Sequence, residues 1–263
     1  MPTRDSAPIG APCWVDLMTS DPGRSRDFYS QLFGWAAEDG DPQFGGYFNF
    51  SKDGSWIAGG MPRGDDHSRP EVWSIYLCTD DAQKTVDAAS DNGAQVIVPP
   101  MPVGDLGTMF FLVDPGGAAI GGWQPGTHPG FKQYGDYNTP SWFELWTRDY
   151  EASLAFYRDV FRWDTEAVSD TPEFRYTLLK SGDEQLAGIM DASAFLPEGV
   201  PAHWSVYFGV EDADATLKRI GDLGGATVVG AEDTPYGRLA TATDPMGAQF
   251  KLVAPNEAMP ARS

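Results

Sequence analysis

Apolar residues recur at helical spacing after Pro22, where Phe28, Leu32 and Phe33 fall on one face of an expected helix. Asp21 stands in the place of an N-cap, and Pro22 takes the first helical position, where no backbone N–H is needed. The pattern therefore predicts an amphipathic helix over about residues 22–34, with its aromatic face packed into a core.

The same stretch occurs a second time further along the chain. Asp149 follows Asp21 by 128 residues (149 − 21 = 128), and the same offset relates Trp142 to Trp14. Such a repeat indicates that one structural unit is used twice.

Short strands with apolar and aromatic residues surround both helical stretches. A turn at Asp114–Gly117 closes the first series of strands, and a matching turn at Asp244–Gly247 closes the second. We expect an α+β protein of two tandem modules, residues 8–123 and 140–255, joined by a linker over 124–139. Each module should be a pair of βαβββ units that form a curved mixed sheet around a cleft.

The net charge of −20 and the pI near 4.3 argue against nucleic-acid and anionic membrane partners, because both would repel the chain. Two cysteines are too few for a disulfide framework, and residues 1–10 lack an apolar signal segment. No run reaches the roughly 18 apolar residues of a membrane helix. We therefore expect a cytoplasmic protein with no membrane partner, and a monomer, since two modules can pair within one chain.

The Phe28-Tyr29 and Phe33-Gly34-Trp35 motifs, a middle strand before Asp-Asp or Glu-Asp, and the Asp-Pro-x-Gly turn occur in both halves with small changes. Over residues 12–123 and 140–254 this series resembles the vicinal oxygen chelate superfamily. That superfamily includes glyoxalase I, bleomycin-resistance proteins and extradiol dioxygenases. The Trp-x-Asp/Glu-Leu start and the Phe-Gly-Trp end resemble a two-module, glyoxalase-like subfamily whose members are often labelled hydroxylases. One scaffold hosts many chemistries, so the resemblance implies the fold more sharply than the activity.

Metal-using members of that superfamily place His, Gln or Glu ligands at three strand positions in each module. The resemblance puts these positions at Trp14, Ser74 and Gly121 in the first module and at Trp142, Ser205 and Lys251 in the second. Tryptophan and glycine offer no ligand atom, serine is a poor ligand, and lysine is a cation. The three histidines, His67, His128 and His203, lie in a loop, in the linker and just outside a strand. We therefore expect neither a metal nor a cofactor.

Strand alternation predicts which side chains face the cleft and contact a small-molecule ligand. These expected ligand-binding residues are Trp14, Asp16, Tyr76, Trp123, Trp142, Glu144, Trp146, Tyr207 and Lys251. A wall of aromatic side chains with a few polar groups is typical of a small-molecule pocket.

Asp16 and Glu144 occupy equivalent positions (144 − 16 = 128) in strands that are otherwise apolar, and they are the candidate catalytic residues. In one interpretation they are general acids or bases, or hold a donor group of the ligand. In the other they are structural carboxylates that accept hydrogen bonds from indoles, tyrosines or backbone N–H groups.

The leading hypothesis is a metal-free binding protein for an aromatic or apolar small molecule. The alternative is a metal-independent tailoring enzyme of secondary metabolism, hydroxylase-like or an isomerase, in which Asp16, Glu144 and tyrosines transfer protons. A protein without any ligand is a third hypothesis. A metal-dependent glyoxalase or dioxygenase fits the residues least.

Overall fold

The computed structural model describes residues 5–64 and 69–259, so His67 lies outside the described residues. The first module contains the following elements in chain order: β1 (Pro12–Thr19), α1 (Pro22–Phe33), β2 (Ala36–Ala37), the short 3-10 helix η1 (Pro42–Phe44), β3 (Phe48–Lys52), β4 (Ser55–Pro62), β5 (Val72–Cys78), α2 (Ala82–Asp91), β6 (Gln95–Val103), β7 (Gly107–Val113) and β8 (Ala119–Pro125). Its strands form an eight-stranded sheet in the order β2-β3-β4-β1-β5-β8-β7-β6.

The second module repeats this series: β9 (Pro140–Thr147), α3 (Tyr150–Phe161), β10 (Asp164–Asp170), β11 (Arg175–Ser181), β12 (Glu184–Asp191), β13 (His203–Gly209), α4 (Ala213–Asp222), β14 (Ala226–Thr234), β15 (Gly237–Thr243) and β16 (Gln249–Ala254). The strand order of its sheet, β10-β11-β12-β9-β13-β16-β15-β14, matches that of the first sheet position by position. The predicted α+β fold with two tandem modules and mixed sheets is therefore confirmed.

The first helix begins and ends where its sequence signals predict. The Asp21 side chain accepts a hydrogen bond from the backbone N–H of Arg24 at 2.9 Å, and Gly34 ends the helix in the left-handed conformation with φ of 72°. In the repeat, Arg162 takes the place of that glycine with φ of 57°, and Asp149 makes no side-chain cap. The duplicated helix therefore keeps its place in the fold with weaker end signals.

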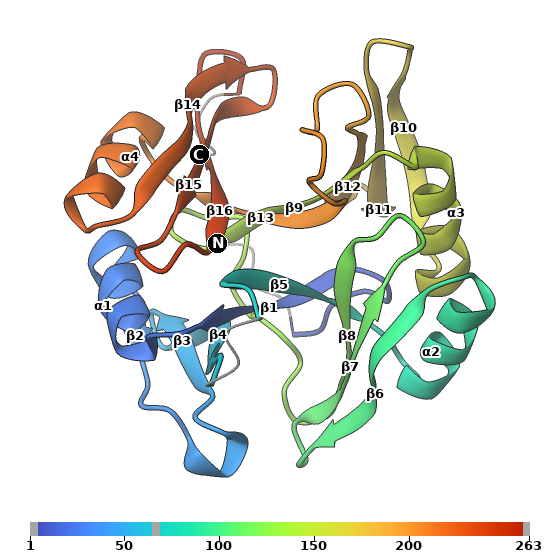
Figure 1. Cartoon of the computed structure of the whole chain (residues 1–263), viewed down its shortest axis with the longest axis horizontal. Coiled ribbons are helices and arrows are strands. Elements are labelled where there is room, and N and C mark those ends of the chain that lie inside the picture. The colour runs from blue at the N-terminus through green and yellow to red at the C-terminus, as the bar shows by residue number, and fades with distance from the viewer. Residues whose placement is uncertain (1–4, 65–68, 260–263) are drawn as a thin grey trace.

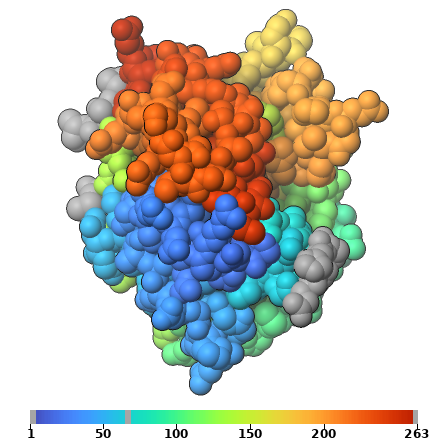
Figure 2. Space-filling view, turned by 60° about the vertical axis from the view of Figure 1, so that its left-hand side comes forward, coloured from blue at the N-terminus to red at the C-terminus, as the bar shows by residue number. Residues whose placement is uncertain are grey.

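Figure 1 shows that each sheet bends into a U and that the two sheets stand back to back, opening in opposite directions. Helices α1 and α4 lie together on one side of the molecule, and α2 and α3 lie together on the other. Figure 2 shows the contact of α1 and α4 across the seam between the modules. A surface hollow of 270 Å³, lined by Leu32, Asn138 and Arg219 among others, lies at this seam on the outside of the sheets.

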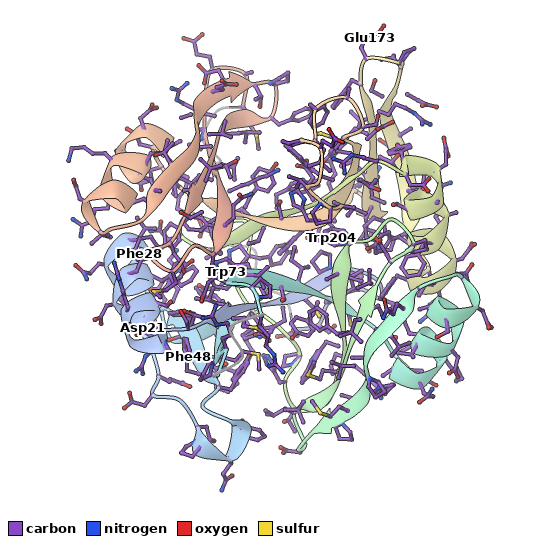
Figure 3. The ribbon with its side chains drawn as sticks, in the orientation of Figure 1. Asp21, Phe28, Phe48, Trp73, Glu173 and Trp204 are labelled. Carbon is purple, nitrogen blue, oxygen red and sulfur yellow. The ribbon has the colours of Figure 1, made fainter. Side chains whose placement is uncertain are left out.

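Two series of side-chain hydrogen bonds join the modules, and both run through residues of the repeated sequence motifs. Trp73 donates to the Tyr29 hydroxyl at 2.9 Å, and that hydroxyl donates to Asp244 of the other module at 3.2 Å. Trp204 likewise donates to Tyr157, which donates to Asp114, both at 2.8 Å. Trp73 and Trp204 lie between the two sheets (Figure 3).

Each of these aspartates also holds its own Asp-Pro-x-Gly turn. The second oxygen of Asp114 accepts from the backbone N–H of Ala118 at 2.8 Å, and that of Asp244 accepts from Ala248 at 2.9 Å. Burial raises the pKa of both carboxyl groups above the ordinary value, and their hydrogen bonds oppose that change. The turn motif thus positions a carboxylate for the contact between modules.

No helix in the described part of the chain is both long and apolar enough to span a membrane.

Candidate functional site

We call the face of each sheet that carries no helix its inner face. Glu144 lies at the centre of the inner face of the second module. Strand β9 pairs Glu144 with Gly188 of β12 on one side and with Ser205 of β13 on the other. Gly188 leaves room for the Tyr176 hydroxyl beside Glu144, because a Cβ at residue 188 would lie 2.0 Å from the tyrosine oxygen. Strands β13 and β16 place Tyr207 beside Lys251.

The Glu144 carboxylate, only 5% exposed, accepts hydrogen bonds from side chains of four strands. Its Oε1 accepts from the Tyr176 hydroxyl at 2.9 Å. Its Oε2 accepts from the Tyr207 hydroxyl at 2.6 Å, the Trp146 indole at 2.5 Å and the Lys251 ammonium at 3.3 Å. A carboxylate that is buried in this way is stable only because its oxygens are paired.

Lys251 is the cation of this arrangement and is also 5% exposed. Its Nζ donates to the Tyr207 hydroxyl at 3.1 Å and lies 3.6 Å from the centroid of the Trp146 ring, a cation–π contact. Burial lowers the pKa of Lys251, and the Glu144 carboxylate opposes that change. Glutamate, tyrosine, lysine and tryptophan therefore form one buried polar cluster.

Aromatic side chains that remain accessible surround this buried cluster. The ring centroid of the half-buried Trp146 lies 5.2 Å from that of Phe195 and 6.0 Å from that of His203. Phe195 is 49% exposed, and Tyr236, which stacks on Tyr176 at 6.4 Å, is 48% exposed. We call the cluster of Glu144, Tyr176, Tyr207, Lys251 and Trp146, with the rim of Phe195, His203 and Tyr236, the module-two site.

The inner face of the first module has an equivalent carboxylate, Asp16, but a glycine stands in the place of Lys251. Asp16 accepts from the Tyr47 hydroxyl at 2.6 Å and from the Trp14 indole at 2.8 Å. Gly121 occupies the position of Lys251, and the Tyr76 ring lies where a side chain at Gly121 would begin. Burial raises the pKa of Asp16 to about 6, against hydrogen bonds from Tyr47, Tyr76 and Trp14.

The linker between the modules passes inside the U of the first sheet (Figure 1). The His128 ring centroid lies 4.5 Å from that of Trp14, 5.6 Å from that of Trp56 and 5.7 Å from that of Trp123. Burial lowers the pKa of His128 to about 4. Trp14 is only 4% exposed beneath this segment. The sequence predicted a linker here, and the structure adds that the linker covers an inner face.

The structure divides the sequence-predicted ligand residues between two separate faces. Trp14, Asp16, Tyr76 and Trp123 come together in the first module, whereas Trp142, Glu144, Trp146, Tyr207 and Lys251 come together in the second. Trp142 contacts the cluster through Tyr176, to whose hydroxyl it donates at 3.0 Å.

Sequence reasoning missed several residues of these faces: Tyr47, Tyr176, Trp56, His128, Phe195 and Tyr236. A signal did exist for Tyr47 and Tyr176, because they are related by an offset of 129 (176 − 47 = 129), close to that of the whole repeat. The other four have no counterpart in the repeat that singles them out.

The positions that the superfamily resemblance assigns to metal ligands do not fit a metal ion. A transition-metal site needs three or four nitrogen, oxygen or sulfur donors that converge on one point. At these positions the first module has Trp14, Ser74 and Gly121, and Lys251 of the second module donates to Glu144. Within residues 5–64 and 69–259, no group of three His, Cys, Asp or Glu side chains is placed to hold a metal. The expected absence of a metal remains a prediction.

The Glyoxalase/Bleomycin resistance protein/Dioxygenase superfamily model matches residues 13–121 and 139–252. The chain is 37% identical over 260 residues to "Putative glyoxylase CFP32" of Mycobacterium tuberculosis, with 97% of this chain and 98% of that protein covered. It is 37% identical over 268 residues to the "Anthracycline biosynthesis protein DnrV" of Streptomyces peucetius, with 96% of each covered.

Solved structures with the same fold include the Mn(II)-bound glyoxalase from Novosphingobium aromaticivorans, with a TM-score of 0.65, 13% identity, and 95% of this chain and 83% of that chain covered. The 2,3-dioxygenase LapB from Pseudomonas sp. KL28 matches with a TM-score of 0.61, 13% identity, and 94% and 92% covered. These structural matches show the fold alone. The family model spans both modules and the relatives align over nearly their whole length, so this chain belongs to the Glyoxalase/Bleomycin resistance protein/Dioxygenase superfamily.

Proposed function

We propose that the chain is a metal-free binding protein for a planar aromatic small molecule, which it holds at the module-two site. The observation that carries this proposal is a buried lysine–glutamate pair directly beneath accessible aromatic rings. Grouped, exposed aromatic side chains over a few convergent polar groups are the usual make-up of a ligand site.

The polar cluster supports a ligand that carries a carbonyl or hydroxyl oxygen. The Lys251 ammonium donates to Glu144 and Tyr207 and lies against the face of the Trp146 ring. An ammonium has three donors, so a ligand oxygen beside Trp146 would be bound by Lys251 more strongly than the ring face is. Flat rings of the ligand would then stack on Trp146 and Phe195.

The relatives support the same class of molecule. One of them is named as an anthracycline biosynthesis protein, and anthracyclines are planar aromatic compounds with ketone and hydroxyl oxygens. We therefore place this chain in secondary metabolism, as a protein that binds an intermediate or product of that chemical class.

The test is a fluorescence titration of the purified protein with 1,4-dihydroxyanthraquinone. We expect saturable quenching of tryptophan emission by the native chain and affinity at least about tenfold weaker for Trp146→Leu, since an aromatic anchor contributes on the order of 1–2 kcal/mol. Met18→Leu is the matched control, because Met18 is the equivalent position of the first module (146 − 18 = 128). Unchanged affinity in Trp146→Leu, or no quenching by this probe and by other hydroxylated polycyclic aromatics, would contradict the proposal.

A second candidate function is a metal-independent tailoring enzyme. It is favoured by the continuous contact from Lys251 through Tyr207 to Glu144, since such a chain of donors and acceptors can relay a proton to a bound ligand. In the first module the linker packs on Trp14, the indole that donates to Asp16, so this candidate assigns the proton transfer to the second module. Loss of turnover in Glu144→Gln with ligand affinity retained would favour the enzyme over the binding protein.

A further inference from the structure

His128 occupies the inner face of the first module as a bound molecule would. Its imidazole stands edge-on to the Trp14 indole at 4.5 Å and also contacts the rings of Trp56 and Trp123. We call these three indoles the indole box. Edge-to-face contacts of this kind are favourable arrangements for flat rings.

The backbone on both sides of His128 is fixed to the first module. The N–H groups of Gly126 and His128 both donate to the carbonyl of Leu106, at 2.8 and 3.1 Å. The Trp123 indole donates to the His128 carbonyl at 2.9 Å, so a wall of the box also holds the segment that enters it.

The segment after His128 is anchored just as closely. Phe131 donates from its backbone N–H to the carbonyl of Cys13 at 2.9 Å, and its ring stacks on Phe143 at 5.8 Å. Gly130 has φ of +103°, and a Cβ there would lie 2.3 Å from the Cys13 carbonyl oxygen, so only glycine lets the chain pass this point.

We propose that the inner face of the first module is a binding site whose ligand is the chain's own His128, so that the protein takes one small molecule, at the module-two site. Only the claim that the small molecule binds at the module-two site rests on the proposed function. The claim about His128 does not. The occupant of the indole box is defined by chemistry: a flat, uncharged nitrogen heterocycle of imidazole size.

The contrast between the modules supports one working site rather than two. Trp14 and its equivalent Trp142 both lie beside the central carboxylate, yet Trp14 is buried whereas Trp142 is half-buried. In the second module the segment that follows β16 turns instead to the β14–β15 hairpin, where Asn256 donates to the carbonyl of Thr234 at 2.9 Å. Burial favours the neutral state of the imidazole, which suits a box whose walls are uncharged indoles.

The first experiment removes the internal ligand and supplies it from solution. We expect His128→Ala to melt about 5 °C below the native chain and to regain most of that difference in millimolar imidazole, which should leave the native chain unchanged. Val86→Ala, a core substitution in α2 outside the box, is the matched control and should not be rescued. A His128→Ala protein as stable as the native chain, or one that imidazole does not rescue, would overturn the inference.

The second experiment needs no His128 variant and covers the case in which His128→Ala fails to fold. We expect calorimetric titration of the native chain with 1,4-dihydroxyanthraquinone to give one site per chain, with affinity unchanged within a factor of two in Trp56→Phe. Two sites per chain, or affinity at least tenfold weaker in Trp56→Phe, would overturn the inference while the proposed function stands. If no aromatic probe binds at all, the proposed function fails and the imidazole experiment alone decides the status of the indole box.

Discussion

At the scale of single residues, two equivalent carboxylates are stabilised by different partners. Asp16 is surrounded by neutral donors, whereas Glu144 also has the ammonium of Lys251. The difference arises from a single strand position, which is Gly121 in one module and Lys251 in the other. A buried ion pair adds little net stability, but the loss of one partner leaves an uncompensated charge.

The first prediction concerns that ion pair. Lys251→Met should lower the free energy of unfolding by about 3 kcal/mol, because Glu144 then remains buried without its cation. Adding Glu144→Gln should restore at least about 1 kcal/mol, since the unpaired charge is then removed. Lys180→Met is the control, because its pair with Glu166 is more exposed and should be worth less than about 1 kcal/mol. Denaturant unfolding measures all four proteins, and equal losses for Lys251→Met and Lys180→Met would refute the argument.

The second prediction concerns the pH dependence that Asp16 contributes. Burial raises the pKa of Asp16 from 3.8 to about 6 in the folded chain, so its contribution is fully present below about pH 4 and is lost as the pH rises through 6. Asparagine does not titrate. The stability of Asp16→Asn relative to the native chain should therefore improve by up to about 3 kcal/mol between pH 4 and pH 8.

Denaturant unfolding of both proteins at several pH values between 4 and 8 checks this difference. Parallel pH profiles for Asp16→Asn and the native chain would show that Asp16 ionises in the fold as it does in water.

At the scale of elements, each closing turn joins two strands of its own module and also connects that module to the other one. Each Asp-Pro-x-Gly turn uses one carboxylate oxygen for its own backbone and the other for a tyrosine of the opposite module. The Phe-Tyr motif on α1 and α3 supplies those tyrosines. Helix, turn and middle strand are therefore coupled across the seam, which explains why these motifs are repeated together.

The third prediction tests one of these connections. Tyr157→Phe should lower the free energy of unfolding by about 2 kcal/mol, because Asp114 loses a donor and the Trp204 indole loses its acceptor. A double-mutant cycle with Asp114→Asn should give a coupling energy of about 1 kcal/mol. Tyr236→Phe, at a residue that is 48% exposed, should change stability little. Purely additive effects of Tyr157→Phe and Asp114→Asn would contradict the coupling.

At the scale of the whole molecule, duplication has produced two modules of matching strand order with unlike inner faces. The inner face of the first module is covered by the linker that joins the two modules. The inner face of the second module has Lys251 beneath an aromatic rim. The scaffold is shared with a Mn(II)-bound glyoxalase, but the six metal-ligand positions have two tryptophans, two serines, a glycine and a lysine, none of which is a usual metal ligand.

The fourth prediction follows from that change of residues. The purified protein should carry less than about 0.1 equivalent of zinc, iron, nickel or manganese, because three convergent donors are required to hold such an ion tightly. Elemental analysis measures the content, and treatment with EDTA should leave the melting temperature unchanged. About one metal ion per chain, lost together with stability on chelation, would refute both this prediction and the metal-free function.

Much of the fold could be predicted because its signals are local and occur twice. The cap at Asp21, the alternation in β5 and the Asp-Pro-x-Gly turns each specify structure within a few residues. The middle strand and the turn recur in the second module, whereas Asp149 keeps its place without a side-chain cap. Strand β10 escaped prediction, since its sequence is largely polar and it lies at an exposed sheet edge. An edge strand buries little, so it needs no apolar pattern.

The candidate site could be predicted only in part. Alternation correctly placed Glu144 and Lys251 on the same face as Tyr207, but the contact between the glutamate and the lysine joins residues 107 positions apart. It depends on strand order and register, which bring β9, β13 and β16 side by side. Phe195 and Tyr236 belong to loops and a hairpin turn, where no periodicity indicates a direction.

The sequence by itself determined the two modules, their helices and middle strands, and the set of aromatic and charged residues available to an inner face, because each follows from periodicity or from a short motif. Only the tertiary structure decided which carboxylate acquires a cation and which inner face the chain itself covers. Those outcomes depend on how distant strands pair and on the path of the linker, and backbone hydrogen bonds such as those from His128 to Leu106 and from Phe131 to Cys13 fix that path after the sheet has formed. A local pattern cannot encode such contacts, since either partner alone is compatible with many neighbours.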